Sequence, residues 1–449
     1  MNRTIVALAT PPGIGGLAVI RISGDDAIEI ADKVFKGKKP LKECSTHTIH
    51  YGNIESQGFI IDKITASIFR EPHSYTGENV VEFGCHGGQL VAEQIINLLL
   101  DVGAHFAGPG EFTRRAFLNG KLDLAQVEAV ADIIHSNTVA GVKTAARQLN
   151  GNFTKRLKDL RTELLDIAGL LELELDFSDE GIELIPKEKI KEKIIKAIDF
   201  SNKLADSYLS SEIMRSGFFV GIVGYPNSGK STLFNRLIEK DRAIVSPIPG
   251  TTRDYLEESL FIKGITIRLF DTAGLRSTSD IIEIEGIKIV DSILKQSNLI
   301  LVINDITYGR EHSDSLINKI SLKHPTTKIL IAHNKIDLTN FNFDDTDTEI
   351  FISAFKNIGL ENLKYRIYDI AKNSIERESD ILINQRHANL LKQASLSLST
   401  ALESLNNNME NEFIAIDIRK AVKILGELTG ETWNEEVLDH IFSRFCIGK

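Results

Sequence analysis

A glycine-rich segment in the middle of the chain carries the clearest chemical signal. Residues 224–231 read GYPNSGKS, fit the pattern GxxxxGKS, and follow the apolar run Phe218–Val223. In such a loop, backbone N–H groups surround phosphate oxygens, Lys230 supplies a cation for the β- and γ-phosphates, and Ser231 supplies a hydroxyl ligand for Mg²⁺. The helix that follows adds the positive end of its dipole. The alternative is a chance glycine turn, and the strand-before, helix-after context favours a nucleotide site.

A second segment would complete the phosphate end of this site. Asp271, Thr272, Ala273 and Gly274 follow the predicted strand Ile265–Phe270. The Asp271 carboxylate would lie near the metal ion, and the backbone N–H of Gly274 could reach the γ-phosphate.

Two further segments could recognise the base. Asn334, Lys335 and Asp337 follow the predicted strand Lys328–Ala332, and Ser353–Ala354 follow another short strand. Asp337 can accept both the ring N–H and the exocyclic amine of guanine, a pattern that adenine does not offer, and Ser353–Ala354 can support the base through backbone N–H groups. In this order the segments resemble the guanine-nucleotide motifs of the translation-factor-like GTPases, which favours GTP over ATP.

The group that orients the attacking water differs from that of Ras-type enzymes. Those enzymes place a glutamine directly after the DTAG segment, whereas this chain has Leu275, an apolar residue that cannot orient water. Glu283, twelve residues past Asp271, is a candidate general base. The alternative is an ordinary carboxylate on a helix surface.

Two residues near the phosphates could bind cations. Thr252, in the segment Gly250–Asp254, is a candidate second Mg²⁺ ligand, and Asn227 places a side-chain carbonyl beside the phosphates. With backbone carbonyls of the same region, Asn227 could hold K⁺ between the β- and γ-phosphates. There K⁺ would take the place of an arginine finger, a contribution of about 10³–10⁵ in rate. The alternative is that Asn227 only stabilises the loop.

The elements that would position these residues fall into three blocks. Residues 1–118 mix short β-branched runs with turn clusters and two helical stretches, which predicts an α+β domain. Residues 119–215 and 377–449 show helical periodicity, and residues 216–376 alternate apolar strands with helices. We therefore expect a multidomain α/β plus α protein, in which a Ras-like P-loop domain with a mostly parallel sheet is inserted into a helical domain.

The first helical stretch has the clearest periodicity. Leu160, Leu164, Ile167, Leu171 and Leu175 recur at spacings of three and four residues, so they share one face of a helix. We expect the two halves of the helical domain to pack together, since the ends of an inserted domain often lie close in space.

Composition excludes several classes of protein. The 449 residues include 52 basic and 62 acidic side chains, a net charge of −10, so a nucleic-acid partner would need a local basic patch or a second protein. Three scattered cysteines, Cys44, Cys85 and Cys446, argue for a reducing compartment and against a disulfide framework. No apolar run reaches the ~20 residues of a membrane span. We expect a soluble cytoplasmic protein without membrane association.

Short motifs along the whole chain match one family. They are Thr4–Ala7, Ala9–Gly13, Arg21–Gly24, Tyr75–Glu78, His86–Gly88, Gly108–Thr113, Asn119–Gln126 and Phe445–Lys449. With the inserted P-loop block, the chain resembles the MnmE (also TrmE) tRNA-modification GTPases from end to end.

The resemblance implies a specific function. Members of that family are homodimers through the N-terminal domain, which binds a 5-formyltetrahydrofolate-type folate as one-carbon donor. With an FAD-containing flavoprotein of the MnmG (GidA) family, in a heterotetramer or larger complex, they add a carboxymethylaminomethyl or aminomethyl group to C5 of the wobble uridine of certain tRNAs. Their GTP hydrolysis is stimulated by K⁺ and accompanies dimerisation of the GTPase domains.

The resemblance also assigns residues by position. The folate contacts are Arg21, Glu82, Lys121 and Lys449. The potassium positions are Asn227, Ser246, Ile248 and Thr251, and the magnesium ligands are Ser231 and Thr252. The catalytic residues are Glu283, which matches the water-orienting glutamate, and Asp271. The GTP site comprises Asn227, Ser228, Gly229, Lys230, Ser231, Thr232, Ser246, Thr251, Thr252, Asp271, Thr272, Ala273, Gly274, Asn334, Lys335, Asp337, Ser353 and Ala354.

Some alternatives stay open. A GTP-driven scaffold or assembly factor, for example on the ribosome, would carry the same GTPase motifs, although it would need neither the folate residues nor the C-terminal tail. Cys446 could be a nucleophile or a packing residue, and His86 could contact a ligand or simply occupy a turn.

The potassium hypothesis leads to a kinetic prediction. GTP hydrolysis is expected to be faster in KCl than in NaCl by on the order of tenfold or more, because K⁺ neutralises charge between the phosphates. Asn227→Ala should remove the difference, which steady-state phosphate release in the two salts measures. Equal rates of the unmodified protein in both salts would exclude the potassium site.

Overall fold

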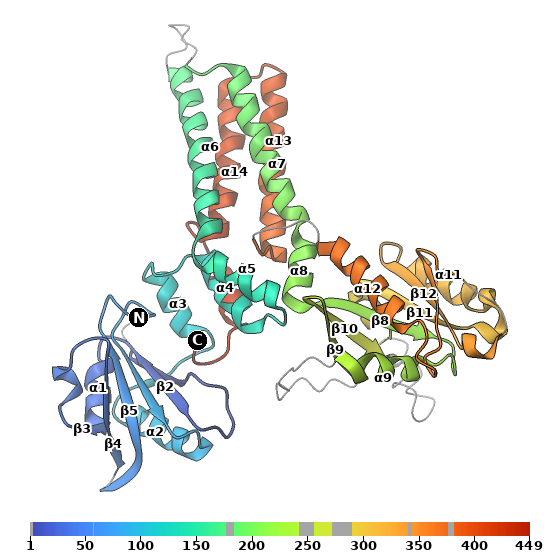
Figure 1. Ribbon diagram of the computed structural model, residues 1–449. Helices are drawn as coiled ribbons and strands as arrows, with labels where there is room; N and C mark the ends of the chain where they lie inside the picture. Colours follow the sequence, from blue (N-terminus) through green and yellow to red (C-terminus); the bar gives the residue numbers. More distant parts are fainter. Residues whose placement is uncertain are drawn as a thin grey trace. The chain divides into compact units, whose positions relative to one another are not determined.

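The computed structural model describes residues 3–56, 58–176, 184–241, 256–271, 290–339, 344–375 and 381–449 (Figure 1). The chain forms two compact units. Unit 1 comprises Met1–Ala131, Gln148–Ile198 and Gln393–Lys449, and unit 2 comprises Asp132–Arg147 and Asp199–Lys392. Among the helices of the described residues, none combines the length and the apolar character needed to cross a bilayer.

Unit 1 begins with a β-sheet whose described strands lie in the order β3-β4-β5-β6-β2-β1-β7. Its elements are β1 (Ile5–Leu8), β2 (Ala18–Ser23), α1 (Ala27–Val34), β3 (Phe35–Gly37), β4 (Thr48–Ser56), β5 (Phe59–Phe69), β6 (Val80–Cys85), α2 (Gln89–Asp101) and β7 (His105–Phe106). Neighbouring strands are antiparallel except for the parallel pair β1 and β7.

Strand alternation decides which side chains of this sheet lie on the face opposite the helices α1 and α2. Ile20 and Ile22 of β2 are buried in one core with residues of α1 and α2. Arg21 lies between them and therefore points to the opposite face. In the antiparallel register Arg21 is paired with Glu82 of β6, so the two charged side chains share that face.

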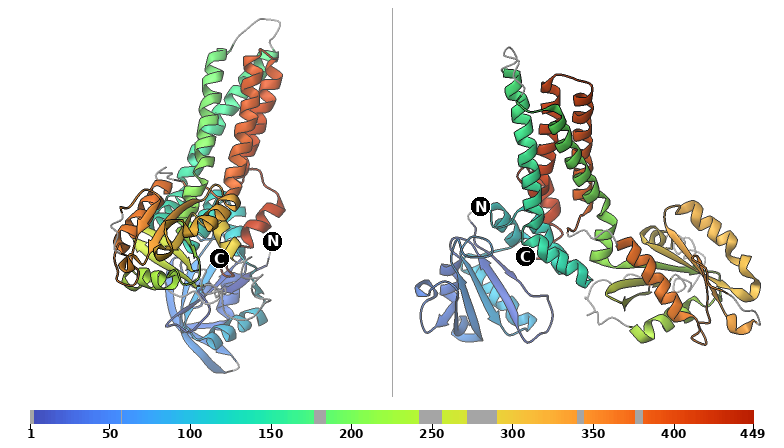
Figure 2. Two further views of the ribbon diagram at one scale, coloured as in Figure 1. Left: turned by 90° about the vertical axis from the view of Figure 1, so that its right-hand side faces the viewer. Right: turned by 45° about the horizontal axis from the view of Figure 1, so that its top comes forward.

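Besides α1 and α2, unit 1 contains α3 (Glu111–Leu118), α6 (Asn152–Asp176), α14 (Asn411–Thr429) and α15 (Glu435–Phe442), together with parts of α4 (Leu124–His135), α7 (Lys187–Asp206) and α13 (Gln385–Asn406). The long helices α6 and α14 form a bundle with the parts of α7 and α13 (Figure 1), whereas α3, α4 and α15 share a separate apolar cluster. Figures 1 and 2 show α6 and α14 side by side, although more than 200 residues separate them in sequence. Of the five predicted core positions of α6, the middle three, Leu164, Ile167 and Leu171, are buried, whereas Leu160 and Leu175 are partly exposed.

Unit 2 contains the P-loop sheet, in the strand order β13-β12-β11-β8-β10-β9. Its elements are β8 (Phe218–Gly224), α9 (Lys230–Asp241), β9 (Leu256–Ile262), β10 (Ile265–Asp271), β11 (Leu299–Asp305), α11 (Asp314–Lys323), β12 (Lys328–Asn334), β13 (Glu349–Phe351) and α12 (Leu360–Ile375). All neighbouring strands are parallel except the hairpin β9–β10. This confirms the predicted, mostly parallel P-loop fold.

The P-loop sheet is covered on both faces. Every residue of β11 is buried, and its side chains divide between two cores. Leu301 packs with residues of α9 and α12, whereas Val302 packs with Ile320 of α11. Both faces are therefore apolar, as parallel sheets require, and polar side chains gather at the carboxyl ends of the strands.

A charged network ties helical segments to the P-loop sheet within unit 2. Arg215, near the end of α8 (Tyr208–Ser216), donates from Nε to Asp132 of α4 at 2.8 Å and from Nη1 to Glu212 at 2.9 Å. The same Nη1 also donates to the carbonyl oxygen of Ile383 at 3.0 Å. The Arg215 side chain is only 11% exposed, so this network fixes the chain directly before β8.

We propose the domain boundaries 1–118, 119–215 with 377–449, and 216–376. The compact unit around the P-loop sheet extends past 216–376 at both ends. A small apolar cluster accounts for this extension: Met214 of α8 and Ala145 of α5 (Val139–Leu149) pack with Leu382 and Ile375.

Removal of the Arg215 guanidinium is expected to destabilise unit 2. Arg215→Ala leaves partly buried carboxylates and a carbonyl without this donor, which should lower the free energy of unfolding by about 3 kcal/mol. Urea unfolding followed by circular dichroism measures the change. Lys203→Ala is the control, because Lys203 forms an exposed ion pair with Asp199 on a helix surface and its loss should leave the stability unchanged. Equal stabilities of the two variants would contradict the structural role of Arg215.

Candidate functional site

The P-loop, residues 224–231, joins β8 to α9 and curls tightly. Asn227 and Gly229 have positive φ angles of 63° and 96°. At position 229 only glycine fits, because a Cβ atom there would lie 2.2 Å from Nδ2 of Asn334. Ser228 and Lys230 are buried, while Asn227 is exposed at the tip of the loop.

The side chain of Lys230 forms hydrogen bonds with backbone groups of the P-loop. Its Nζ donates to the carbonyl oxygens of Gly224 at 3.0 Å and Tyr225 at 2.9 Å. These two acceptors place the ammonium group against the beginning of the loop. The cation is therefore oriented by backbone groups of the P-loop itself.

Oxygen ligands suited to Mg²⁺ meet at the start of α9. Ser231 donates from Oγ to Oδ2 of Asp271 at 3.2 Å. Asp271 ends β10 and is 2% exposed, and Thr232 is the next residue of α9. A hydroxyl and a carboxylate at this spacing are the hard oxygen donors that Mg²⁺ prefers, so the residues fit the ion.

Asn334 connects the P-loop to the segment that is expected to support the base. Its Nδ2 donates to the carbonyl oxygen of Ser228 at 2.9 Å, and its Oδ1 accepts from the backbone N–H of Ala354 at 2.9 Å. The N–H of Ala354 is thus bonded to Asn334. Both ends of the Asn334 amide are used to hold two loops together.

The other residues of the base-reading segment are also oriented. Ser353 donates from Oγ to Oδ1 of Asp337 at 2.6 Å. Lys335 has a positive φ of 70°, and its Nζ bonds Oδ2 of Asp305 at 2.5 Å. Among the described residues, those predicted for the phosphate end and those predicted for the base end therefore lie at the same edge of the sheet, joined by the Asn334 contacts.

Asp305 was not expected from the sequence. It is 5% exposed, ends β11, and also accepts from the backbone N–H and the hydroxyl of Thr307. Burial acts to raise the pKa of this carboxyl, but hydrogen bonds from Lys335 and Thr307 outweigh burial and hold the pKa below its usual value. Its position at the carboxyl end of a buried parallel strand was the signal that could have identified it.

A second cluster of predicted residues lies in unit 1. Arg21 donates from Nε to Glu82 at 2.8 Å and from Nη1 to the carbonyl oxygen of Gly448 at 3.4 Å. Lys449 follows directly. Burial and the nearby Arg21 lower the pKa of Lys449, and Glu82 opposes them only in part. Arg21, Glu82 and Lys449 therefore form one charged group.

Two aromatic residues flank this group and were missed as site residues. The guanidinium of Arg21 lies 5.3 Å from the ring centroid of Tyr75 and 5.6 Å from that of Phe112. Both belong to motifs quoted above, Tyr75–Glu78 and Gly108–Thr113, and their place in those motifs was the available signal. Lys121, the fourth predicted residue, instead donates from Nζ to the carbonyl oxygen of Pro72 at 3.0 Å.

The C-terminal tail reaches the cluster along the N-terminal sheet. Gly448 has a φ of 100°, and a Cβ atom there would lie 2.2 Å from the carbonyl oxygen of Leu8. Ile447 forms an antiparallel bridge with Pro109. Close backbone contact thus delivers Lys449 to Arg21 and Glu82.

The two residues with open roles differ in environment. Cys446 is an exposed free thiol. His86 is bonded through Nδ1 to Oδ1 of Asp62 at 2.6 Å. The neighbouring Cys85 is buried, and burial together with Asp62 raises the pKa of its thiol to about 11, so it stays protonated at neutral pH.

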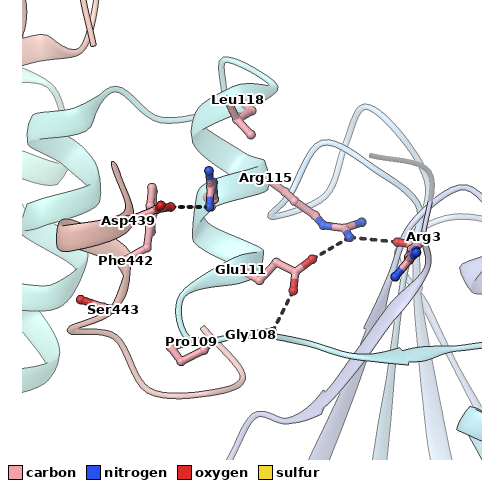
Figure 3. Close-up of a pocket in the computed structure, with 10 residues that line it drawn as sticks. Arg3, Gly108, Pro109, Glu111, Arg115, Leu118, Asp439, Phe442 and Ser443 are labelled. Carbon is pink, nitrogen blue, oxygen red and sulfur yellow. Dashed lines mark hydrogen bonds and ion pairs between the residues drawn. The ribbon is translucent and has the colours of Figure 1, made fainter. Parts of the chain in front are cut away.

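A cavity of about 610 Å³ lies beside the tail, between α3 and α15 (Figure 3). Its lining residues are Arg3, Gly108, Pro109, Glu111, Arg114, Arg115, Leu118, Asp439, Phe442 and Ser443. Arg115 bonds Glu111 and the carbonyl oxygen of Arg3, and Arg114 bonds Asp439 at 2.9 Å. Most charged groups that line the cavity pair with each other. We therefore interpret the cavity as part of the packing between α3 and α15 and not as a ligand site.

Several predicted site residues lie outside the described part of the chain. They are Ser246, Ile248, Thr251 and Thr252, then Thr272, Ala273 and Gly274, and finally Glu283. Their assignments remain expectations from the sequence.

Comparison with known proteins gives consistent matches over the whole chain. A family model described as the GTP-binding protein TrmE N-terminus matches residues 4–121, and one described as the MnmE helical domain matches residues 124–446. The tRNA modification GTPase MnmE of Christiangramia forsetii is 41% identical over 472 residues, covering 100% of both chains. The protein of that name from Cytophaga hutchinsonii is 41% identical over 453 residues, covering 99% of this chain and 98% of its own.

The base-reading geometry leads to a specificity prediction. Asp337→Asn replaces an acceptor by an amide that presents N–H groups to the donors of guanine, so GDP affinity should fall about 100-fold, two charge-assisted hydrogen bonds being lost. Xanthine carries a carbonyl in place of the exocyclic amine, and XDP should bind the variant better than GDP. Competition binding with both nucleotides measures this.

Asp347→Asn serves as the control. Asp347 is a fully exposed carboxylate of the same unit, paired with Arg366. Its replacement should change neither affinity. Unchanged GDP binding by Asp337→Asn would refute the base-reading role.

Proposed function

Because the chain belongs to the MnmE family of tRNA modification GTPases, we propose that it binds and hydrolyses GTP in the course of tRNA modification. One observation carries this proposal. The P-loop, the Asp271 carboxylate and the Asn334–Asp337 segment converge at the carboxyl ends of neighbouring strands of a mostly parallel sheet, linked by direct hydrogen bonds. This is where α/β proteins bind nucleotides.

The residues at the phosphate end would act mainly through electrostatics and position. Lys230 would bind the β- and γ-phosphates, and the N–H groups of residues 227–231 would surround the phosphate oxygens. Ser231 and Thr232 lie in the first turn of α9, which begins at Lys230 and whose N-terminus favours anions. Mg²⁺, held through Ser231 and Thr252 near Asp271, would neutralise charge on the β- and γ-oxygens.

Two further roles are proposed for residues near the phosphates. Asn227 would hold K⁺ together with Ser246, Ile248 and Thr251. The exposed position of Asn227 at the tip of the P-loop supports this proposal, since its side chain is not buried in the loop. Glu283 would orient the attacking water, because Leu275 cannot.

For the second cluster we propose a folate of the 5-formyltetrahydrofolate type. Arg21, Lys449 and Glu82 supply two cations and one carboxylate within a single group flanked by Tyr75 and Phe112. Cations suit the carboxylates of a folate, and aromatic rings and a carboxylate suit its ring system. Lys121 would join this group by moving its amine from Pro72.

The proposed reaction needs partners. We propose a homodimer through the N-terminal domain, acting in the cytoplasm with a flavoprotein of the MnmG (GidA) type that carries FAD, in a heterotetramer or larger complex. Together they would add the carboxymethylaminomethyl or aminomethyl group to C5 of the wobble uridine. The net charge of −10 suggests that local basic patches and the flavoprotein supply most of the tRNA contact.

Nucleoside mass spectrometry of bulk tRNA tests the proposal. Cells that lack the protein are expected to lose the 5-aminomethyl-type wobble uridines, and the unmodified gene or a Lys203→Ala control should restore them. Arg21→Ala should fail to restore them, with reduced binding of 5-formyltetrahydrofolate to the purified protein. If the nucleosides persist without the protein, the modification role fails and a GTP-driven assembly factor becomes the better hypothesis.

A further inference from the structure

Tyr225 is a P-loop residue to which no role has been given so far. Its side chain leaves the loop toward the first turn of α11. Its Oη lies 2.7 Å from Oγ of Ser315, and its ring centroid lies 4.9 Å from that of His312. The ring of His312 also stacks on that of Tyr308, at a centroid distance of 5.0 Å. The side chain is therefore held by one hydrogen bond and one ring contact, both from the same segment.

The backbone carbonyl of Tyr225 forms hydrogen bonds within the P-loop. Its carbonyl oxygen accepts from Nζ of Lys230 at 2.9 Å and from the backbone N–H of Ser228 at 3.3 Å. The atom that orients the phosphate-binding cation thus belongs to the residue whose side chain is anchored to α11. A shift of that side chain would move the acceptor of Lys230.

The P-loop is anchored again on its far side. There Asn334 donates to the carbonyl oxygen of Ser228 at 2.9 Å. Between the two anchors, Pro226 and Asn227 are exposed, and Asn227 adopts a positive φ. Such a loop loses conformational freedom when it binds phosphate, so anchors that hold it in the binding shape increase affinity.

We propose that Tyr225 is a positioning residue for nucleotide binding. The Tyr225–Ser315 hydrogen bond, supported by the ring of His312, fixes the carbonyl on which the Lys230 ammonium rests, and α11 thereby sets the phosphate affinity of the P-loop. Tyr225 acts through Lys230 and does not itself bind the nucleotide. Because Lys230 serves the β-phosphate, GDP and GTP are affected alike. The proposal rests on the proposed nucleotide site and adds a determinant of its affinity.

Small substitutions in the full-length chain test the role of the Tyr225–Ser315 hydrogen bond. Tyr225→Phe removes only the hydroxyl, and Ser315→Ala removes only its partner. Each should weaken binding of fluorescent GDP and of a non-hydrolysable GTP analogue by about 2- to 10-fold, the loss expected for one hydrogen bond. The double variant should be no weaker than either single variant, because both delete the same interaction. KM for GTP should rise while kcat stays unchanged.

The control and the contrary results are distinct. Tyr308→Phe removes the hydroxyl of the 72% exposed outer ring and should leave the affinity unchanged. Thermal unfolding of all variants should match the unmodified protein, which separates positioning from misfolding. The positioning role of Tyr225 would be refuted if Tyr225→Phe bound nucleotide with full affinity. It would also be refuted if the affinity losses of the two single variants multiplied in the double variant. Absence of nucleotide binding by the unmodified protein would instead refute the proposed nucleotide site.

Discussion

The nucleotide site depends on one buried amide. Both polar groups of the Asn334 side chain form hydrogen bonds with backbone groups: Nδ2 donates to the carbonyl oxygen of Ser228, and Oδ1 accepts from the N–H of Ala354. Gly229 makes this contact possible, since any side chain there would displace the amide. A buried amide with both functions satisfied is costly to disturb. The P-loop and the two loops that follow β12 and β13 therefore hold one relative position.

Buried charged side chains elsewhere in the molecule also have hydrogen-bonding partners. Asp305 is buried against Lys335, Arg215 is shared among two carboxylates and a carbonyl, and Arg21 faces Glu82. Except for Arg215 and Glu212, which lie three residues apart on α8, these contacts join segments that are distant in sequence. Charges of this kind are stable inside a protein only when paired. Each pair marks a place where elements must stay in register: the segment after β12, the entry to β8, and the face of the N-terminal sheet that carries Arg21.

Unit 1 brings the two ends of the chain to one place. Arg21 and Gly448 are 427 positions apart, yet they share a hydrogen bond. The contact needs the tail to lie flat on Leu8, which Gly448 allows because it lacks a Cβ atom. The helices α3 and α15, joined through Arg114 and Asp439, lead the chain into that path. The position of Lys449 is thus a consequence of how the last helix packs.

The fold class, several strands and helices, and the phosphate and base motifs could be predicted from the sequence. These features follow local rules, such as the GxxxxGKS spacing, the apolar run of β8 and the three- and four-residue repeat of α6. Tertiary structure alone decided the role of Asp305, the aromatic flanks of Arg21, the anchoring of Tyr225 on α11, and the engagement of the Ala354 N–H by Asn334. These contacts join residues far apart in sequence, and no local periodicity or spacing encodes which distant side chain completes a hydrogen bond once the elements have packed.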